Sequence, residues 1–309
     1  MPAAGNGVAP AGSGVVQVAG EVLATRRTGA YQHLTFAAPG IADLARPGQF
    51  VALAVGGNTS ANLLRRCFSI HQVNPLGADG STVDIVVAAH GPGTTWITRL
   101  AVHDEVDIVG PLGKAFPLQT EPVPCVLVGG GYGSAPLFWL ADQLSARGCR
   151  VEVVLGAASE DRLFGVAHAQ RAALGVTVTT DDGSAGTRGW VSDVLAGVIR
   201  SSGAVAVYAC GPMGMLRSVT EIAAAEGAVA HVAVEEAMAC GVGVCMTCVL
   251  PVVGIDGQTR MVRSCVEGPV FQGDRVRWDA LTNGYGDVPA DAFGAPSAGT
   301  AGASPGGGD

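Results

Sequence analysis

The chain has 309 residues, which is long enough for two or three domains with a substantial core. Its formal net charge of −8 at pH 7 argues against a protein that binds nucleic acid, because such proteins need a basic face. Residues 1–14 lack the basic and apolar stretches of a signal peptide, so we expect a cytoplasmic protein whose cysteines are reduced.

Composition and periodicity divide the chain into five segments. Residues 1–14 and 284–309 are expected to be disordered tails, since the second is rich in Gly, Ala, Pro and Ser. Residues 15–118 should form a first domain, residues 119–232 a second, and residues 233–283 a cysteine-rich third. We therefore predict a multi-domain protein of the β plus α/β class.

The first domain consists of short apolar runs separated by Gly and Pro turns, with almost no helical periodicity. This pattern predicts an antiparallel β-barrel. The expected strands cover residues 17–24, 33–37, 49–55, 67–72, 83–89 and 105–109.

Two motifs in the predicted barrel could bind a ligand that has a phosphate and a flat ring. The tetrapeptide RCFS places a cation, an aromatic ring and a hydroxyl on one strand, although plain strands also contain such residues. The segment GPGTT lies between a strand and a short helix, where glycine backbone and hydroxyls can cradle a phosphate. The alternative is a capped turn with Thr94 or Thr95 as the N-cap. The candidate residues are Arg66, Cys67, Phe68, Ser69, Gly91, Gly93, Thr94 and Thr95.

The second domain alternates strands and helices, which predicts a parallel α/β sheet. Strands are expected at residues 123–128, 150–155, 176–179 and 204–209, and helices at residues 135–147, 190–199 and 213–225.

Two turns of the second domain are candidates for binding a dinucleotide. The turn GGGYGSA follows a strand and opens a helix, as a nucleotide-binding glycine turn does, and CGPM follows the carboxyl end of another parallel strand. An acidic residue after the second strand, Glu160, can accept ribose hydroxyls and favours NAD over NADP, unless it is only the solvated start of a helix. The other candidates are Gly129, Gly130, Gly131, Gly133, Ser134, Ala135, Cys210, Gly211, Pro212 and Met213.

The third domain holds four of the eight cysteines, at the C-x₄-C-x₂-C…C spacing typical of plant-type 2Fe–2S ligation. A zinc site is the alternative, but zinc sites usually use paired knuckles or histidines, which are absent here. Residues 237–255 are uncharged over a membrane-spanning length, yet their glycines and Pro251 make them a poor helix. The predicted ligands are Cys240, Cys245, Cys248 and Cys265.

In this order, the motifs RCFS, GPGTT, GGGYGSAPL and CGPMGML and the four cysteines resemble the ferredoxin-reductase superfamily. More closely, the chain resembles the electron-transfer subunits of NAD-linked, two-subunit dihydroorotate dehydrogenases. The resemblance implies an FAD-binding barrel, an NAD-binding α/β domain and a cluster domain. It assigns FAD to Arg66, Phe68, Ser69, Gly93, Thr94 and the backbone of Val87, Ala88 and Ala89. Phe68 stands where the family often has Tyr.

The implied mechanism passes electrons from an FMN-bearing catalytic partner through the cluster and FAD to NAD⁺, in pyrimidine biosynthesis. Cys210 would lie beside the nicotinamide, and the family implies a dimer of heterodimers. No (β/α)₈ barrel that could hold FMN and oxidise dihydroorotate fits in this chain. One alternative is the flavoprotein subunit of an NAD(P)H-linked ferredoxin or sulfide oxidoreductase. Another, of a different class, is a zinc-stabilised binding module without redox activity.

Overall fold

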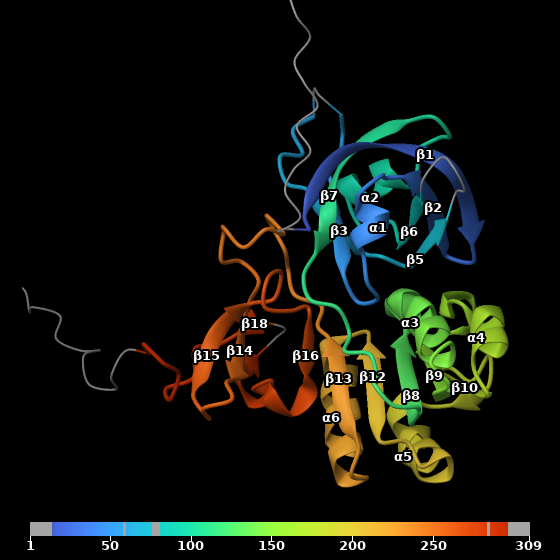
Figure 1. Cartoon of the computed structure of the whole chain (residues 1–309), viewed down its shortest axis with the longest axis vertical. Coiled ribbons are helices and arrows are strands. Elements are labelled where there is room, and N and C mark those ends of the chain that lie inside the picture. The colour runs from blue at the N-terminus through green and yellow to red at the C-terminus, as the bar shows by residue number, and fades with distance from the viewer. Residues whose placement is uncertain (1–13, 58–59, 76–80, 283–284, 296–309) are drawn as a thin grey trace, which may run out of the picture.

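The computed structural model of the protein describes residues 14–57, 60–75, 81–282 and 285–295. It places a curved antiparallel sheet above an α/β layer, with a smaller C-terminal segment beside both (Figure 1). The expected N-terminal tail lies, except for Gly14, outside the described residues.

The first sheet has seven antiparallel strands in the order β4-β3-β7-β1-β2-β6-β5. Its two edge strands are consecutive in the chain and only Ile70 and His71 separate them, so the sheet must curl round on itself like a barrel. Its elements are β1 (Val16–Thr28), β2 (Tyr31–Ala37), α1 (Ile41–Leu44), β3 (Phe50–Leu53), β4 (Arg66–Ser69), β5 (Gln72–Pro75), β6 (Ser81–Val87), α2 (Pro92–Ile97) and β7 (Glu105–Leu112).

Each expected strand of this domain overlaps an observed one, and the predicted antiparallel β-domain is confirmed. The run at residues 67–72 is not one strand, however. It is divided between β4 and β5, because the fully buried Ile70 turns the chain into the core at the corner of the barrel.

The second sheet has the order β11-β10-β9-β8-β12-β13-β16 and is parallel except for its last strand. Helices α3 and α4 pack on one face with Leu127 and Tyr208, whereas α5 and α6 pack on the other with Val126 and Val128. Successive residues of β8 thus point to opposite faces, as in any strand buried on both sides. The elements are β8 (Pro124–Gly130), η2 (Gly131–Ser134), α3 (Ala135–Ser145), β9 (Arg150–Ala157), η3 (Glu160–Arg162), α4 (Val166–Ala172), β10 (Gly175–Thr180), β11 (Thr187–Arg188), α5 (Val191–Ser202), β12 (Ala206–Cys210), α6 (Met213–Ala225) and β13 (Val229–Ala233).

The cysteine-rich segment is attached to both sheets. Its strand β16 (Val270–Gln272) pairs with β13 at the edge of the α/β sheet. The amide of Lys114, just after the barrel, donates to the carbonyl oxygen of Gly268, 2.6 Å away. The remaining elements are β14 (Val249–Val253), β15 (Thr259–Arg263), η4 (Gly273–Arg275), η5 (Trp278–Ala280), β17 (Leu281–Thr282) and β18 (Tyr285–Gly286).

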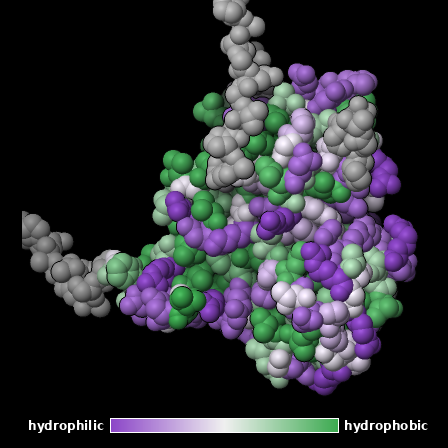
Figure 2. Space-filling model, in the orientation of Figure 1, coloured by the Kyte–Doolittle hydropathy of each residue, from purple (hydrophilic) through white to green (hydrophobic). Residues whose placement is uncertain are grey.

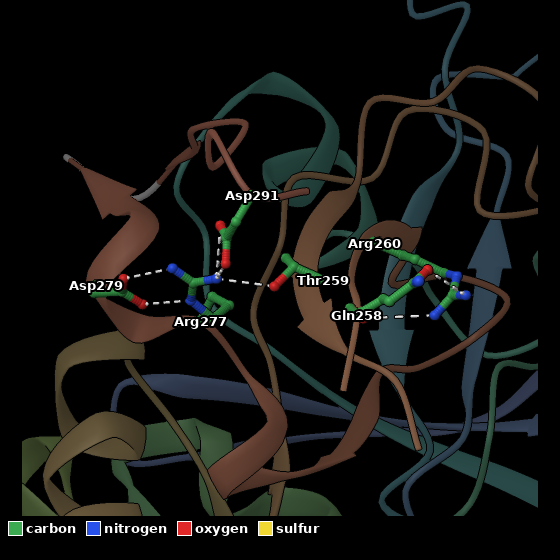
Figure 3. A network of polar contacts seen from close by, with 6 residues as sticks. All are labelled: Gln258, Thr259, Arg260, Arg277, Asp279 and Asp291. Carbon is green, nitrogen blue, oxygen red and sulfur yellow. Dashed lines mark hydrogen bonds and ion pairs between the residues drawn. The ribbon is translucent and has the colours of Figure 1, made fainter. Parts of the chain in front are cut away.

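Arg277 fastens the end of the described chain to this segment (Figure 3). Its guanidinium binds Asp279 at 2.9 Å and Asp291 at 2.8 Å, and donates to Thr259 Oγ1 at 2.8 Å. The amide of Phe293 donates to the carbonyl oxygen of Thr259, also at 2.8 Å. The described part of the C-terminal tail is therefore held against β15.

None of the helices in the described ranges has both the length and the apolar character needed to cross a bilayer. The uncharged stretch at residues 237–255 forms the cysteine loop and strand β14 instead of a helix.

Candidate functional site

A cavity of about 860 Å³ lies where the barrel, the α/β sheet and the start of the cysteine-rich segment meet. Most of the candidate residues from the barrel and the two α/β turns line it: Arg66, Cys67, Phe68, Ser69, Ala88, Thr94, Gly130, Gly131, Gly133, Ala135, Cys210, Gly211 and Pro212. The other candidates do not line it: Val87, Ala89, Gly91, Gly93, Thr95, Gly129, Ser134, Glu160 and Met213.

On the barrel side, β4 meets the start of α2. A Cβ atom at Gly93 would lie 2.8 Å from Arg66 Nε, so glycine is what allows the guanidinium to pack against the turn. Thr94 Oγ1 accepts hydrogen bonds from the amides of His90 and Gly91 and thereby shapes the turn. The N-cap of α2 is Gly91, so the alternative with Thr94 or Thr95 as N-cap is wrong.

On the α/β side, the two candidate turns touch each other. Strands β8 and β12 are neighbours, with Gly129 opposite Cys210, so their carboxyl ends are adjacent. A Cβ at Gly133 would lie 2.9 Å from Gly211 Cα, which leaves no room for a side chain between the turns. Ser134 is buried and its hydroxyl donates to the carbonyl oxygen of Gly131, so it stabilises the turn rather than facing the cavity.

Cys210 forms part of the cavity wall at the end of β12. Burial raises the pKa of its thiol to about 12, and the Glu235 carboxylate adds to the shift. Cys210 is therefore a neutral thiol at neutral pH. Glu236 also lines the cavity, its Oε1 has no hydrogen-bond partner among the described residues, and burial raises its pKa to about 7.

Several cavity residues escaped the sequence analysis. Tyr31 and Tyr132 lie 5.6 Å apart between ring centroids, and Tyr31 donates to the carbonyl oxygen of Arg162 across the two domains. Asp181, directly after β10, also lines the cavity, whereas Glu160 belongs to the 3₁₀ turn η3 outside it. Isolated tyrosines have no sequence signature, and the turn Asp181–Ser184, which carries two carboxylates, is on sequence alone most simply a surface turn near the cofactor.

A β-hairpin brings together two of the four predicted ligand cysteines, Cys248 and Cys265. Strands β14 and β15 lie between Cys248 and Cys265 and form an antiparallel pair in which Val249 lies opposite Arg263. The residues just outside this hairpin therefore lie close together. The amide of Ser264 donates to the carbonyl oxygen of Cys248 at 2.8 Å.

The thiols form two pairs. Cys240 Sγ accepts hydrogen bonds from the amides of Val244 and Cys245 at 3.4 and 3.5 Å. Desolvation alone would raise its pKa, but these amides and the Cys245 thiol lower it to about 6. In the second pair, Cys248 Sγ accepts from the amide of Cys265 at 3.4 Å, and the two thiols also hydrogen-bond to each other.

This two-by-two arrangement fits a dinuclear cluster, in which four thiolates are shared between two irons. A structural zinc ion would instead draw all four ligands to one centre. The donor set and its spacing thus suit a 2Fe–2S cluster better than zinc.

The cysteine loop packs directly on the barrel beside the cavity. A Cβ at Gly241 would lie 3.0 Å from Cys67 Sγ, 3.5 Å from Phe50 Cε2 and 3.6 Å from Ala52 Cβ. Gly241 has a φ of +72°, so it needs glycine for its backbone as well as for this close approach. The cysteine loop and the cavity therefore meet at Cys67 and Phe50, which line the cavity and also face Gly241.

A comparison with protein-family models matches residues 235–277 to the iron–sulfur cluster binding domain of dihydroorotate dehydrogenase B. The electron transfer subunit of dihydroorotate dehydrogenase B (NAD(+)) from Geobacillus thermodenitrificans is 39% identical over 246 residues, which cover 79% of this chain and 91% of the relative. The chain belongs to this family of electron transfer subunits. The subunit of the same name from Enterococcus faecalis is 36% identical over 243 residues, covering 76% of this chain and 88% of its own length.

The solved structures give the same fold. The NADH-dependent reduced ferredoxin-NADP oxidoreductase, described for flavin-based electron bifurcation, matches with a TM-score of 0.73 and 27% identity over 87% of this chain and 92% of its own. A ferredoxin NADP⁺ reductase from Neisseria gonorrhoeae with bound FAD and NADP has a TM-score of 0.54 and 15% identity, covering 70% of this chain and 93% of that one. The predicted ferredoxin-reductase-like fold and oxidoreductase class are confirmed.

Proposed function

We propose that this chain is the electron-transfer subunit of an NAD⁺-dependent dihydroorotate dehydrogenase and binds FAD, a 2Fe–2S cluster and NAD. A nicotinamide exchanges hydride pairs and a cluster exchanges single electrons, whereas a flavin can do both and so belongs between them. The observation that carries the proposal is the contact between Gly241 of the cysteine loop and Cys67 of β4. It supports a cluster close to the flavin, because the loop with the predicted ligands packs on the strand that borders the cavity.

FAD would occupy the barrel side of the cavity. Arg66, held against Gly93, supplies a cation for a phosphate, and Ser69 and Thr94 supply hydroxyls on the same wall. Phe68 packs against the barrel core and gives an apolar surface for a ring. Together these groups match the polar and apolar parts of a flavin dinucleotide.

NAD would occupy the α/β side, over the touching turns at Gly129–Ser134 and Cys210–Met213. Peptide groups of the glycine turn and the start of α3 favour a pyrophosphate. Cys210 would border the nicotinamide as an uncharged thiol that helps to exclude water. Asp181 would accept a ribose hydroxyl, and its charge would repel a 2′-phosphate.

Oxidation of dihydroorotate is assigned to a separate FMN-bearing catalytic subunit, because the described residues form two seven-stranded sheets, two two-stranded sheets and no (β/α)₈ barrel. The composite reaction is dihydroorotate plus NAD⁺ to orotate, NADH and a proton. An apolar surface next to the thiols could dock this partner, since Val242, Val244, Met246 and Val266 are exposed. Figure 2 shows apolar side chains on this side of the molecule, where the segment coloured orange in Figure 1 adjoins the barrel.

The assembly would be a dimer of heterodimers in the cytoplasm. Family resemblance supports the stoichiometry, and the use of thiolate ligands suits a reducing compartment. Native mass spectrometry of the co-expressed subunits tests the assembly, and a one-to-one complex would contradict it.

The central test compares the purified chain with and without its partner. Alone, it should be brown-yellow, give a rhombic EPR signal after reduction and pass electrons from NADH to an artificial acceptor. Dihydroorotate should reduce its flavin only after the FMN subunit is added. Reduction by dihydroorotate without the partner would disprove this division of labour, and a colourless protein that retains zinc would disprove the cluster.

A second candidate is the flavoprotein subunit of an NAD(P)H-linked ferredoxin oxidoreductase, which the match to the reduced ferredoxin-NADP oxidoreductase favours. It predicts co-purification with a multi-cluster partner and no dihydroorotate-dependent reduction in the complex.

A further inference from the structure

Cys67 is a fifth cysteine beside the four predicted ligands. It lies opposite Ala52 in the β3–β4 ladder, so both side chains point to the same face of the sheet. The cysteine loop covers that face, because a Cβ at Gly241 would lie 3.0 Å from Cys67 Sγ and 3.6 Å from Ala52 Cβ. Cys240, Cys248 and Cys245 of that loop lie close enough for charges on their thiols to act on the Cys67 thiol.

The Cys67 side chain and the side chains of its two neighbours in β4 point to opposite faces of the sheet. Side chains of successive strand residues point to opposite faces. Arg66 accordingly packs against Gly93, and Phe68 packs with the barrel core. Cys67 lines the cavity and also touches the cysteine loop. Within the described chain it thus connects the proposed flavin site to the cluster ligands through one side chain.

We propose that Cys67 is a positioning residue of the iron–sulfur centre, whose S–H group donates a hydrogen bond to a sulfur atom of the centre and so raises its reduction potential. The inference rests on the proposed function, since it needs the cluster. Hydrogen bonds to cluster sulfurs favour the reduced state because they stabilise its additional negative charge. A cysteine S–H group is a weak hydrogen-bond donor, so Cys67 can supply such a bond from its place against the cysteine loop.

The test compares Cys67→Ala and Cys67→Ser with the control Cys149→Ala in the full chain. Cys149 is also a free thiol, but it is buried in the core between the α/β sheet and α3. Each protein is equilibrated with fixed ratios of NADH to NAD⁺, and the reduced fraction of the cluster is read by EPR. Pulsed EPR in H₂O and D₂O then detects exchangeable protons coupled to the cluster.

Cys67→Ala should keep its cluster, but its ratio of reduced to oxidised cluster should fall about threefold, as expected for the loss of one weak hydrogen bond. One exchangeable proton coupling should disappear with it. Cys67→Ser, which keeps a donor, should stay near the wild-type ratio, and Cys149→Ala should match the wild type.

An unchanged ratio and proton spectrum in Cys67→Ala would overturn the inference, and so would loss of the cluster, because Cys67 would then be a ligand. If Cys67→Ala is insoluble, Cys67→Ser decides instead. The coupling assigned to the wild-type thiol proton should change in Cys67→Ser; if it stays the same, that proton does not belong to Cys67 and the inference is overturned. Failure of the proposed function is distinguishable, since the wild-type chain itself would then show no cluster signal.

Discussion

Arg263 Nη1 donates a hydrogen bond to the carbonyl oxygen of Gly243, 2.8 Å away, and so ties β15 to the cysteine loop. The same guanidinium pairs with Glu267 at 2.8 Å. Gly243 has a φ of +81°, and a Cβ there would collide with Val266. We expect Arg263→Ala to loosen this turn and to speed cluster loss several-fold, measured as bleaching of visible absorbance in the presence of an iron chelator.

Arg260→Ala is the matched control. Arg260 lies on the same strand and also forms an ion pair, with Asp256 at 2.7 Å, but that pair is exposed near the tip of the hairpin. Its removal should change the bleaching rate little, because exposed pairs contribute little stability. Equal bleaching of the two variants would show that the contact to Gly243 does not hold the loop.

Much of the fold could be predicted, because apolar periodicity and Gly and Pro turns are visible within short segments of the sequence. The alternation of residues 123–225 defined α3, α5 and α6, and the turns between strands defined most of the barrel. Helix α4, with seven residues of which only Ala169 is buried, and strand β13 were missed. Strand β16 could not be found either, because its place beside β13 depends on a return of the chain after the cysteine loop.

In the candidate site, too, features that are local in the sequence could be predicted, and features that depend on packing could not. Cysteine spacing and glycine turns are properties of short segments, so the sequence indicated them directly. The contact of Cys67 with Gly241 joins residues far apart in the chain, and only the packed domains bring them together. For the same reason Cys67 was grouped with the flavin residues of its own strand, whereas its thiol is directed at the loop.

Asp181, rather than Glu160, is expected to set the preference for NADH. Asp181 lines the cavity, whereas Glu160 lies outside it and its amide donates to Ser184 Oγ. Removing the carboxylate charge at the cavity relieves repulsion of a 2′-phosphate. Asp181→Asn should therefore raise kcat/KM for NADPH relative to NADH about tenfold, measured with an artificial electron acceptor.

Glu160→Gln serves as the companion to this variant and also tests the preference inferred from sequence. It should leave the ratio of the two kcat/KM values unchanged. A larger change in Glu160→Gln than in Asp181→Asn would return the specificity role to Glu160.

Gly93→Ala should weaken FAD binding. Its methyl group would lie 2.8 Å from Arg66 Nε, so the guanidinium must leave the turn that it packs against. We expect at least a tenfold loss of FAD affinity, measured by the flavin retained after dialysis and by titration of the apoprotein. Gly197→Ala, at a position in α5 with open space around it, should keep normal FAD content and gain slightly in stability. Full flavin retention in Gly93→Ala would argue against Arg66 as a phosphate ligand.

His71 should make the fold sensitive to acid. Its Nδ1–H donates to the carbonyl oxygen of Ala135 at 2.6 Å, which links the barrel to α3. Burial lowers the pKa of His71 from its ordinary 6.5 to about 4. Between these values the unfolded chain binds more protons than the folded one. The free energy of unfolding should therefore fall as the pH falls from 6.5 to 4, by up to about 3 kcal/mol from this residue.

The variant His71→Gln removes this titration and should flatten the pH dependence of the urea midpoint between pH 6.5 and 4. It should also be less stable than wild type at pH 7, because it loses the edge-on contacts of the ring with Phe138 and Phe164. His103→Asn is the control, since His103 is exposed and its φ of +74° is one that asparagine tolerates. Parallel midpoint curves for wild type and His71→Gln would mean that His71 takes up its proton in the folded protein as readily as in the unfolded chain.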